Sequence, residues 1–398
     1  MSEEVSSAGT TRKPAGIKNW GGVVIVTLFC LFLLSPNLIH LAQLGTDTSK
    51  FEKRDMEPFP PLGTEVINYI RFPRKFERYF NDHLGPRSVL IKLFARFQYL
   101  WLQKSPLEKV MLGRDGWLFF NQLWEMDPVG AYSGAAQFTP AEMAEVTNYL
   151  TAWRDWLKAR GVKFYVLFVP HKFSVYPEFL PSRVVRVHPK NRMDNLLEHL
   201  RRNTDLNLVD SRGPIVAQKN GPYPLFFKTD THWTRPGAFI AYEEMMKAVK
   251  RDFPDIPVET MNDYRITKSE VPGGDLANMI LLSDEIRDWQ FEMVPVGGER
   301  FKAVSDNPTG GVKEPIITEN ENPNLPSAVV FRDSFFVFLH PFLSQDLSRA
   351  VYIWSPHLDA ASIEQENPDF VVLEVLERLV HRILGGALPP PSRAAAGD

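Results

Sequence analysis

From residue 140 onwards, segments with helical periodicity alternate with short, continuous apolar segments. The predicted order is helix Pro140–Ala159, strand Lys163–Val169, helix Asn191–Arg202, strand Leu206–Asp210, strand Leu225–Thr229 and helix Pro236–Val249. Further strands are predicted at Ala328–Phe331, Ala350–Trp354 and Phe370–Leu373. This alternation predicts an α/β fold with a parallel sheet and helices on both of its faces.

Residues 253–326 interrupt the alternation because they are rich in Pro, Gly and Asn. We interpret them as an irregular insertion that walls or covers a site at the sheet edge. Upstream, Gly113–Phe120 predicts a hairpin, in which Gly-Arg-Asp-Gly forms the turn and the following apolar residues form a strand.

One stretch in the alternating region carries reactive side chains. Asp230 and His232 follow the predicted strand Leu225–Thr229, and Thr234 and Pro236 then provide the start of a helix. An Asp beside a His can fix the imidazole tautomer, and the His can then act as a general base for a hydroxyl nucleophile. The same residues are equally compatible with a surface turn that carries an ordinary histidine.

The candidate nucleophile is Ser334, which follows the predicted strand Ala328–Phe331. A serine at a strand end lies at the carboxyl edge of an α/β sheet, where its backbone N–H can stabilise an oxyanion. Asp-Ser pairs are common, so the serine alone is weak support for catalysis. Because no Asp-x-x-His follows Ser334, a triad would have to take its base from upstream, at His232.

These motifs resemble the permuted SGNH hydrolase-like family that includes the alginate acetylation proteins AlgJ and AlgX. Residues 229–234 match the family pattern Thr-Asp-x-His-Trp-Thr at every defined position. The other family-like phrases are Phe76–His83, Gly113–Phe119, Val169–Lys172, Tyr176–Glu178, Gly273–Leu276 and Val372–Glu377. The sequence departs from ordinary SGNH enzymes at Arg332, where a glycine normally stands.

The resemblance implies a periplasmic O-acetyltransferase that acetylates an exported, alginate-like polysaccharide through an acetyl-Ser334 intermediate, with His232 as base and Asp230 orienting it. It also implies a membrane-bound O-acyltransferase (MBOAT-type) as the partner that supplies acetyl groups. Two alternatives stay open: a periplasmic carbohydrate esterase, and a non-catalytic scaffold or glycan-binding subunit.

Four further residues are predicted to contact the substrate. His171 follows a strand end, and Lys172 matches a family position. Trp233 is expected either to stack on a sugar ring or to belong to the core, and Arg332 either to narrow the pocket or to bind an anionic group. A metal site on Asp230 and His232 would need a third ligand, which no neighbouring residue supplies. We therefore expect neither a metal nor a cofactor.

The N-terminus predicts a membrane anchor. Arg12, Lys13 and Lys18 precede a segment without charged residues that ends before Asp47. This pattern predicts an uncleaved signal anchor in the inner membrane, with the N-terminus in the cytoplasm and the catalytic domain in the periplasm. A cleaved signal peptide stays open as the alternative, because the strongly apolar part, Val23–Leu34, has only twelve residues. The predicted organisation is a cytoplasmic segment 1–19, an anchor 20–44, a stalk and helical region 45–110, a catalytic domain 111–385 and a disordered tail 386–398.

Composition excludes some classes of protein. The net charge of −3 gives no sign of nucleic-acid binding. The single cysteine, Cys30, excludes an intrachain disulfide and any cysteine-based metal site.

Overall fold

In the computed structural model of the chain, the structure describes residues 20–41, 57–61, 66–82, 87–122, 127–305 and 314–391. They form two compact units, residues 1–94 and residues 95–398. The predicted segment 1–19, residues 45–56, 62–65 and 83–86 of the predicted stalk and helical region, and residues 392–398 of the predicted tail lie outside the described residues. The predicted domain boundary at residues 110 and 111 stays a prediction.

The first unit contains α1 (Trp20–Leu41) and α3 (Val66–Asp82), and the boundary between the units falls within the residues of α4 (Arg87–Leu100). Helix α1 occupies most of the predicted anchor. Within the described ranges, no helix is long and apolar enough to cross a membrane. The transmembrane anchor stays a prediction.

The second unit is built on a sheet of seven strands in the order β4-β3-β11-β9-β10-β8-β7. Strands β4, β3, β11, β9 and β10 are parallel, and β8 and β7 add an antiparallel edge. The strands are β3 (Lys163–Val169), β4 (Asn207–Asp210), β7 (Phe301–Ala303), β8 (Ile316–Asn320), β9 (Ala328–Arg332), β10 (Arg349–Trp354) and β11 (Phe370–Leu376). The predicted parallel core is confirmed.

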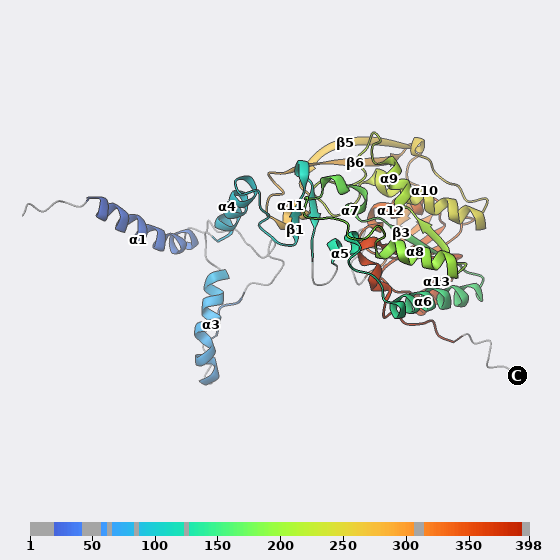
Figure 1. The fold of residues 1–398 in the computed structure, drawn as a ribbon, viewed down its shortest axis with the longest axis horizontal. Coiled ribbons are helices and arrows are strands. Elements are labelled where there is room, and N and C mark those ends of the chain that lie inside the picture. The colour runs from blue at the N-terminus through green and yellow to red at the C-terminus, as the bar shows by residue number, and fades with distance from the viewer. Residues whose placement is uncertain are drawn as a thin grey trace, which may run out of the picture. The chain divides into compact units, whose positions relative to one another are not determined.

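Each central strand is buried on both faces, which explains why its sequence is continuously apolar. In β11, Val372 packs into one core cluster, while Val371 and Leu373 pack into another on the opposite face. The first cluster includes residues of α10 and α12, and the second includes residues of α6, α8 and α13 (Figure 1). The helices are α5 (Pro128–Ser133), α6 (Pro140–Lys158), α7 (Lys172–Val175), α8 (Arg192–Asn203), α9 (Arg212–Gln218), α10 (Arg235–Asp252), α12 (Phe336–Ser344) and α13 (Ala360–Glu366).

The predicted hairpin forms between β1 (Val110–Leu112) and β2 (Leu118–Phe120). The predicted strand Leu225–Thr229 is wrong. Only Phe226 forms a bridge, and its partner is Trp233 in the same loop. Backbone groups of this segment bond to the part of the same loop that runs back alongside it, since the Thr234 N–H donates to the Leu225 carbonyl at 3.0 Å. It therefore adds no strand to the sheet.

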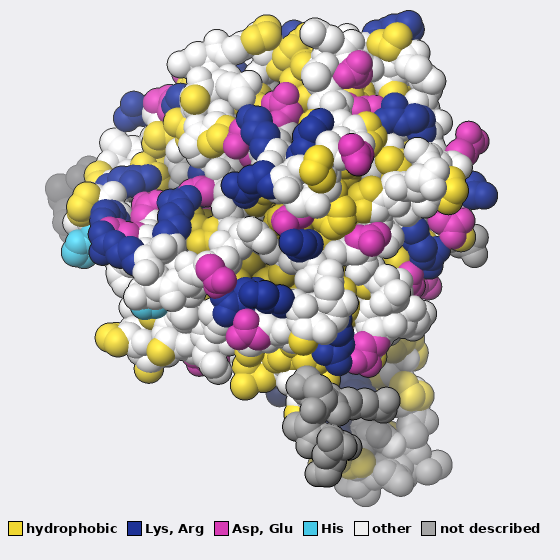
Figure 2. Space-filling model, turned by 90° about the vertical axis from the view of Figure 1, so that its right-hand side faces the viewer, with side chains coloured by type: hydrophobic (Ala, Val, Ile, Leu, Met, Phe, Trp, Pro, Cys, Tyr) yellow, Lys and Arg dark blue, Asp and Glu magenta, His cyan; other side chains and the backbone are white. Residues whose placement is uncertain are grey.

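The prediction that residues 253–326 are irregular is also wrong for much of their length. Strand β5 (Tyr264–Pro272) pairs with β6 (Arg287–Pro295), and β7 and β8 join the main sheet. The short helix α11 (Asp275–Met279) lies between β5 and β6. On the face of the molecule drawn in Figure 2, acidic and basic side chains are interspersed.

Candidate active site

The nucleophile turn, residues 332–335, follows the end of β9 at the carboxyl edge of the sheet. The Asp333 carboxylate accepts a hydrogen bond from the Phe335 N–H at 2.8 Å, and the Asp333 N–H donates to Glu374 at 2.9 Å. These bonds hold the backbone on both sides of Ser334. The sequence therefore places the serine as predicted, directly beyond a buried parallel strand.

The base loop, residues 228–233, brings His232 to this serine across 102 residues of sequence. His232 Nε2 lies 2.8 Å from Ser334 Oγ, and His232 Nδ1 lies 2.6 Å from Asp230 Oδ1. The tautomer that suits these contacts carries its proton on Nδ1, which donates to Asp230 and leaves Nε2 free to accept the serine proton. The three side chains predicted from sequence thus form one connected chain.

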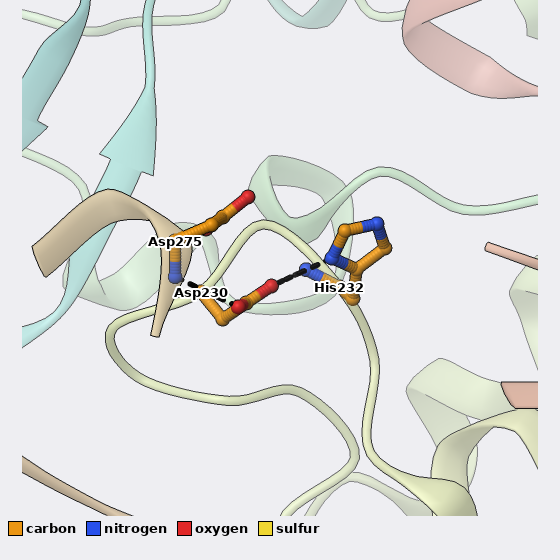
Figure 3. A group of neighbouring side chains, drawn as sticks. All are labelled: Asp230, His232 and Asp275. Carbon is orange, nitrogen blue, oxygen red and sulfur yellow. Dashed lines mark hydrogen bonds and ion pairs between the residues drawn. The ribbon is translucent and has the colours of Figure 1, made fainter. Parts of the chain in front are cut away.

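Asp230 is held by more than the histidine ring. Its Oδ1 also accepts the His232 N–H at 2.9 Å, and its Oδ2 accepts the Asp275 N–H at 2.9 Å (Figure 3). Burial alone would raise the pKa of this carboxyl. The hydrogen bonds and positive charge of His232, together with the hydrogen bond from the Asp275 N–H, outweigh burial and hold the pKa well below its usual value. Asp230 is therefore an anion that can stabilise a protonated His232.

Asp275 is a site residue that the sequence analysis missed. It lies at the start of α11, inside the predicted insertion, and accepts the Thr231 N–H at 2.8 Å and the Thr231 hydroxyl at 2.6 Å. Burial and the neighbouring Asp230 raise its pKa. The sequence contained one sign of this residue: Asp275 lies in the family-like phrase Gly273–Leu276, to which no function had been assigned. Its role in the structure is to fix the base loop.

Lys172 is not placed to contact a substrate, so this prediction is wrong. Its side chain is fully buried, and Nζ donates to the carbonyls of Leu118, Lys228 and Asp230 at 2.7, 2.8 and 3.0 Å. Burial lowers the pKa of Lys172 to about 7, although nearby carboxylates attract its charge. The lysine ties the base loop to β2.

Trp233 belongs to the core, the second of its two predicted roles, and is not placed to stack on a sugar ring. The side chain is completely buried, and its Nε1–H donates to the Phe335 carbonyl at 2.9 Å. This bond joins the base loop to the nucleophile turn. His171 is buried and stacked on Phe173, with ring centroids 4.6 Å apart. Arg332 is buried and lies over the Trp354 ring at 4.8 Å. Substrate contact by His171 and Arg332 stays a prediction.

A third potential metal ligand does exist, contrary to the sequence analysis. Asp230, His232 and Asp275 offer ligand atoms within 4.8 Å of one another (Figure 3). Their polar atoms are already engaged: His232 Nδ1 with Asp230, Asp230 with backbone donors, and Asp275 with Thr231. A metal ion there would replace the contact that orients His232. The geometry suits an orienting carboxylate better than a metal ligand.

The arrangement can increase the nucleophilicity of Ser334. His232 can remove the serine proton as the oxygen attacks an electrophile, and Asp230 can stabilise the imidazolium that forms. The same group can return the proton to a leaving group. This chemistry suits acyl transfer or ester hydrolysis.

A model of the family described as "SGNH hydrolase-like domain, acetyltransferase AlgX" matches residues 110–352. That range contains Asp230, His232, Asp275 and Ser334. The match confirms the SGNH hydrolase-like α/β fold expected from the sequence.

Curated relatives and solved structures were also found. The probable alginate O-acetylase AlgJ of Pseudomonas fluorescens is 29% identical over 193 residues, covering 46% of this chain and 44% of that protein. The protein of the same name from Pseudomonas aeruginosa is 22% identical over 259 residues, covering 63% and 61%. This chain therefore spans less than half the length of the P. fluorescens relative. The O-acetyltransferase domain of Pseudomonas putida AlgJ is 20% identical, with a TM-score of 0.47, and the match covers 70% of this chain and 94% of that one.

Proposed function

The chain belongs to the family of SGNH hydrolase-like acetyltransferases described for AlgX, and we propose that it is itself an O-acetyltransferase acting on a polysaccharide. The observation that carries this proposal is the connected chain Asp230–His232–Ser334, with contacts of 2.6 and 2.8 Å. Ser334 is the nucleophile, His232 is the general base and Asp230 orients the histidine.

The reaction proceeds in two halves. Ser334 Oγ forms a bond to the acetyl carbonyl carbon of the donor, and its proton passes to His232 Nε2. The bond between the acetyl group and the donor then breaks, and the departing donor oxygen or sulfur takes that proton. In the second half, a sugar hydroxyl loses its proton to His232 and attacks acetyl-Ser334. The new sugar ester leaves, and the proton returns to Ser334.

A polysaccharide acceptor is supported by the names of the relatives, which are probable alginate O-acetylases. An alginate-like exported polysaccharide is the acceptor that we propose. The proposed acetyl supplier is a membrane-bound O-acyltransferase, on the basis of the family resemblance alone.

The location is part of the proposal. The basic residues before the uncharged segment that contains α1 support a cytoplasmic N-terminus, an anchor in the inner membrane and a periplasmic catalytic domain. Protease treatment of spheroplasts tests this location. The catalytic domain should be degraded without breaking the inner membrane, and protection until lysis would contradict the proposal.

The activity is tested by incubating the full chain with p-nitrophenyl acetate and measuring acetylated peptides by mass spectrometry. We expect an acetyl group on Ser334 that is absent in Ser334→Ala and His232→Ala. Exposed Ser269 and His188 provide matched controls, because Ser269→Ala and His188→Ala should acetylate Ser334 as the wild type does. A folded wild type without acetyl-Ser334 would favour the scaffold alternative.

A second measurement separates transfer from hydrolysis. Acetyl-Ser334 should decay faster when an alginate oligosaccharide is added, and the acetyl group should appear on the sugar. Decay to free acetate at the same rate with and without the sugar would favour the esterase alternative.

A further inference from the structure

Arg378 lies at the same sheet edge as Ser334 but has no part in the triad. The 3-10 helix η4 (Glu377–Ile383) begins directly after β11, and β11 pairs in parallel with β9. Arg378 and Ser334 therefore each lie two residues beyond the ends of neighbouring parallel strands. Parallel strands end at one edge, so these two residues belong to the same part of the site.

The contacts of Arg378 place its guanidinium beside the residue that follows the nucleophile. Its central carbon lies 5.5 Å from the ring centroid of Phe335, the residue after the nucleophile. A second aromatic contact is the Phe120 ring, also at 5.5 Å. The Phe335 ring in turn lies 5.0 Å from the His232 ring. The guanidinium and the catalytic base thus share one aromatic neighbour.

The guanidinium is buried without hydrogen-bond partners. Arg378 is only 7% exposed, and within the described residues its Nε and Nη1 are enclosed with no acceptor. The carboxylates that attract its charge are Asp333, Asp275 and Asp230. Each of these already accepts hydrogen bonds from neighbouring groups. None of them forms an ion pair with Arg378.

An unpaired buried guanidinium is costly, because arginine stays charged and loses its water. Such a group is stabilised when an anionic oxygen reaches it. In acyl transfer, an anionic oxygen develops beside the nucleophile, since the carbonyl electron pair moves onto oxygen as Ser334 Oγ bonds to carbon. The Ser334 N–H is one donor for this oxygen, and no hydrogen bond within the described residues uses it.

We propose that Arg378 binds the negatively charged oxygen of the tetrahedral intermediates at Ser334. This inference rests on the proposed acyl transfer and adds a second group to the oxyanion site. The charge is present before substrate arrives, so no reorganisation is needed when the intermediate forms. Arg378 is then a catalytic residue, whereas Lys172 is a positioning residue whose donors are already used.

The test compares Arg378→Met, Arg378→Lys and Arg382→Met in the full chain. Arg382 lies on the same short helix and is exposed, so Arg382→Met controls for removing a positive charge from η4. The acetylation rate of Ser334 by p-nitrophenyl acetate should fall about 10²-fold or more in Arg378→Met, as for loss of one oxyanion donor. Arg378→Lys should lose less, and Arg382→Met should match the wild type.

A second readout separates this role from a structural one. Phenylboronic acid forms an anionic tetrahedral adduct with a reactive serine, so its affinity should fall by the same factor as the acetylation rate. The melting temperature of Arg378→Met should equal or exceed that of the wild type, because an unpaired buried charge has been removed. A matching loss of stability in both Arg378 variants, with boronate affinity unchanged, would overturn the proposal.

The outcomes distinguish this inference from the proposed function. If Arg378→Met forms acetyl-Ser334 at the wild-type rate and binds phenylboronic acid with the wild-type affinity, the inference alone is overturned. Absence of acetyl-Ser334 in the wild type would overturn both. If Arg378→Met is acetylated normally but transfers poorly only to a polyuronate, and not to a neutral glucan, Arg378 binds an acceptor carboxylate and the inference is wrong.

Discussion

The base loop and the nucleophile turn meet at the hydrogen bond between His232 and Ser334, but their buried polar groups differ. In the base loop, Asp230 accepts three hydrogen bonds and Thr231 is held by Asp275. The Lys172 side chain donates hydrogen bonds to three backbone carbonyls. Around the nucleophile turn, by contrast, Arg332, Glu374 and Arg378 each have enclosed polar atoms without a partner among the described residues.

This difference separates two tasks. A general base must be held in one orientation, and saturated hydrogen bonds provide that rigidity. The groups that meet a developing charge must keep their hydrogen-bonding capacity until substrate arrives. We call the base loop with Lys172 and Asp275 the paired region, and Arg332, Glu374 and Arg378 around the nucleophile turn the unpaired region. Substitutions in the paired region should disturb the resting structure, whereas substitutions in the unpaired region should leave it largely unchanged.

The largest expected effect comes from Asp230→Asn, which replaces the carboxylate that accepts three hydrogen bonds in the base loop. An amide cannot stabilise the imidazolium, and its N–H₂ group favours the wrong histidine tautomer. The rate of Ser334 acetylation should fall by on the order of 10⁴-fold, as in a serine protease triad. Release of p-nitrophenol in stopped-flow measurements gives this rate, and Asp288→Asn provides a control that alters Thr229 but not the triad.

The same substitution has a pH signature. The folded pKa of Asp230 is lowered, so its ionisation stabilises the fold above the unfolded value of about 3.9, and this contribution is lost as pH falls through the folded pKa. The stability lost in Asp230→Asn should therefore be largest near neutral pH and shrink in strong acid. A difference that grows with acidity, measured by urea unfolding, would contradict an ionised Asp230.

Lys172→Met should have the next largest effect, on stability. Three carbonyls lose their donor at once, and a buried unpaired group costs about 1–3 kcal/mol, so we expect a loss of about 3 kcal/mol or more. Urea unfolding measures this loss, with Lys302→Met as an exposed control expected to stay within about 0.5 kcal/mol. A neutral result would show that the base loop does not depend on this lysine.

The sequence predicted the parts of the site that depend on local pattern. The apolar run Ala328–Phe331 gave a buried strand, and Ser334 follows it as expected. Thr234 gave a helix start, since its hydroxyl caps α10. The meeting of Ser334 with His232 was predicted because each follows a predicted strand and His232 was the upstream candidate for the base. That meeting is correct, although the base is carried by a loop rather than by a strand.

The remaining parts depend on tertiary contacts that no local pattern reveals. Asp275 reaches Thr231 across 44 residues, from a segment whose Pro and Gly content predicted irregular structure. Lys172 was predicted to line a cleft and Trp233 was left between cleft and core, because sequence does not show which way a side chain points beyond a strand end. Both turn inward, where backbone carbonyls accept their N–H groups.

The smallest expected effect is that of Glu374→Gln, which sharpens the description of the unpaired region. Burial and the neighbouring Asp333 raise the pKa of Glu374 well above its usual value, which favours its protonated form in the folded chain. The amide oxygen of Gln can still accept the Asp333 N–H. We therefore expect the free energy of unfolding near pH 4, before the unfolded carboxyl ionises fully, to change by no more than about 1 kcal/mol, with exposed Glu270→Gln as the control.

The pH dependence gives the sharper test of Glu374→Gln. The folded pKa of Glu374 lies above the unfolded value of about 4.3. Between these two pKa values the native state binds more protons than the unfolded state, so the wild type loses stability as pH rises from the lower value to the higher one. Gln does not titrate, so the variant should gain on the wild type as pH rises above about 4.3. If the variant instead loses ground over that range, Glu374 is an ionised partner of Arg332. The nucleophile turn would then be as fully paired as the base loop, and the contrast between the two regions would rest on Arg378 alone.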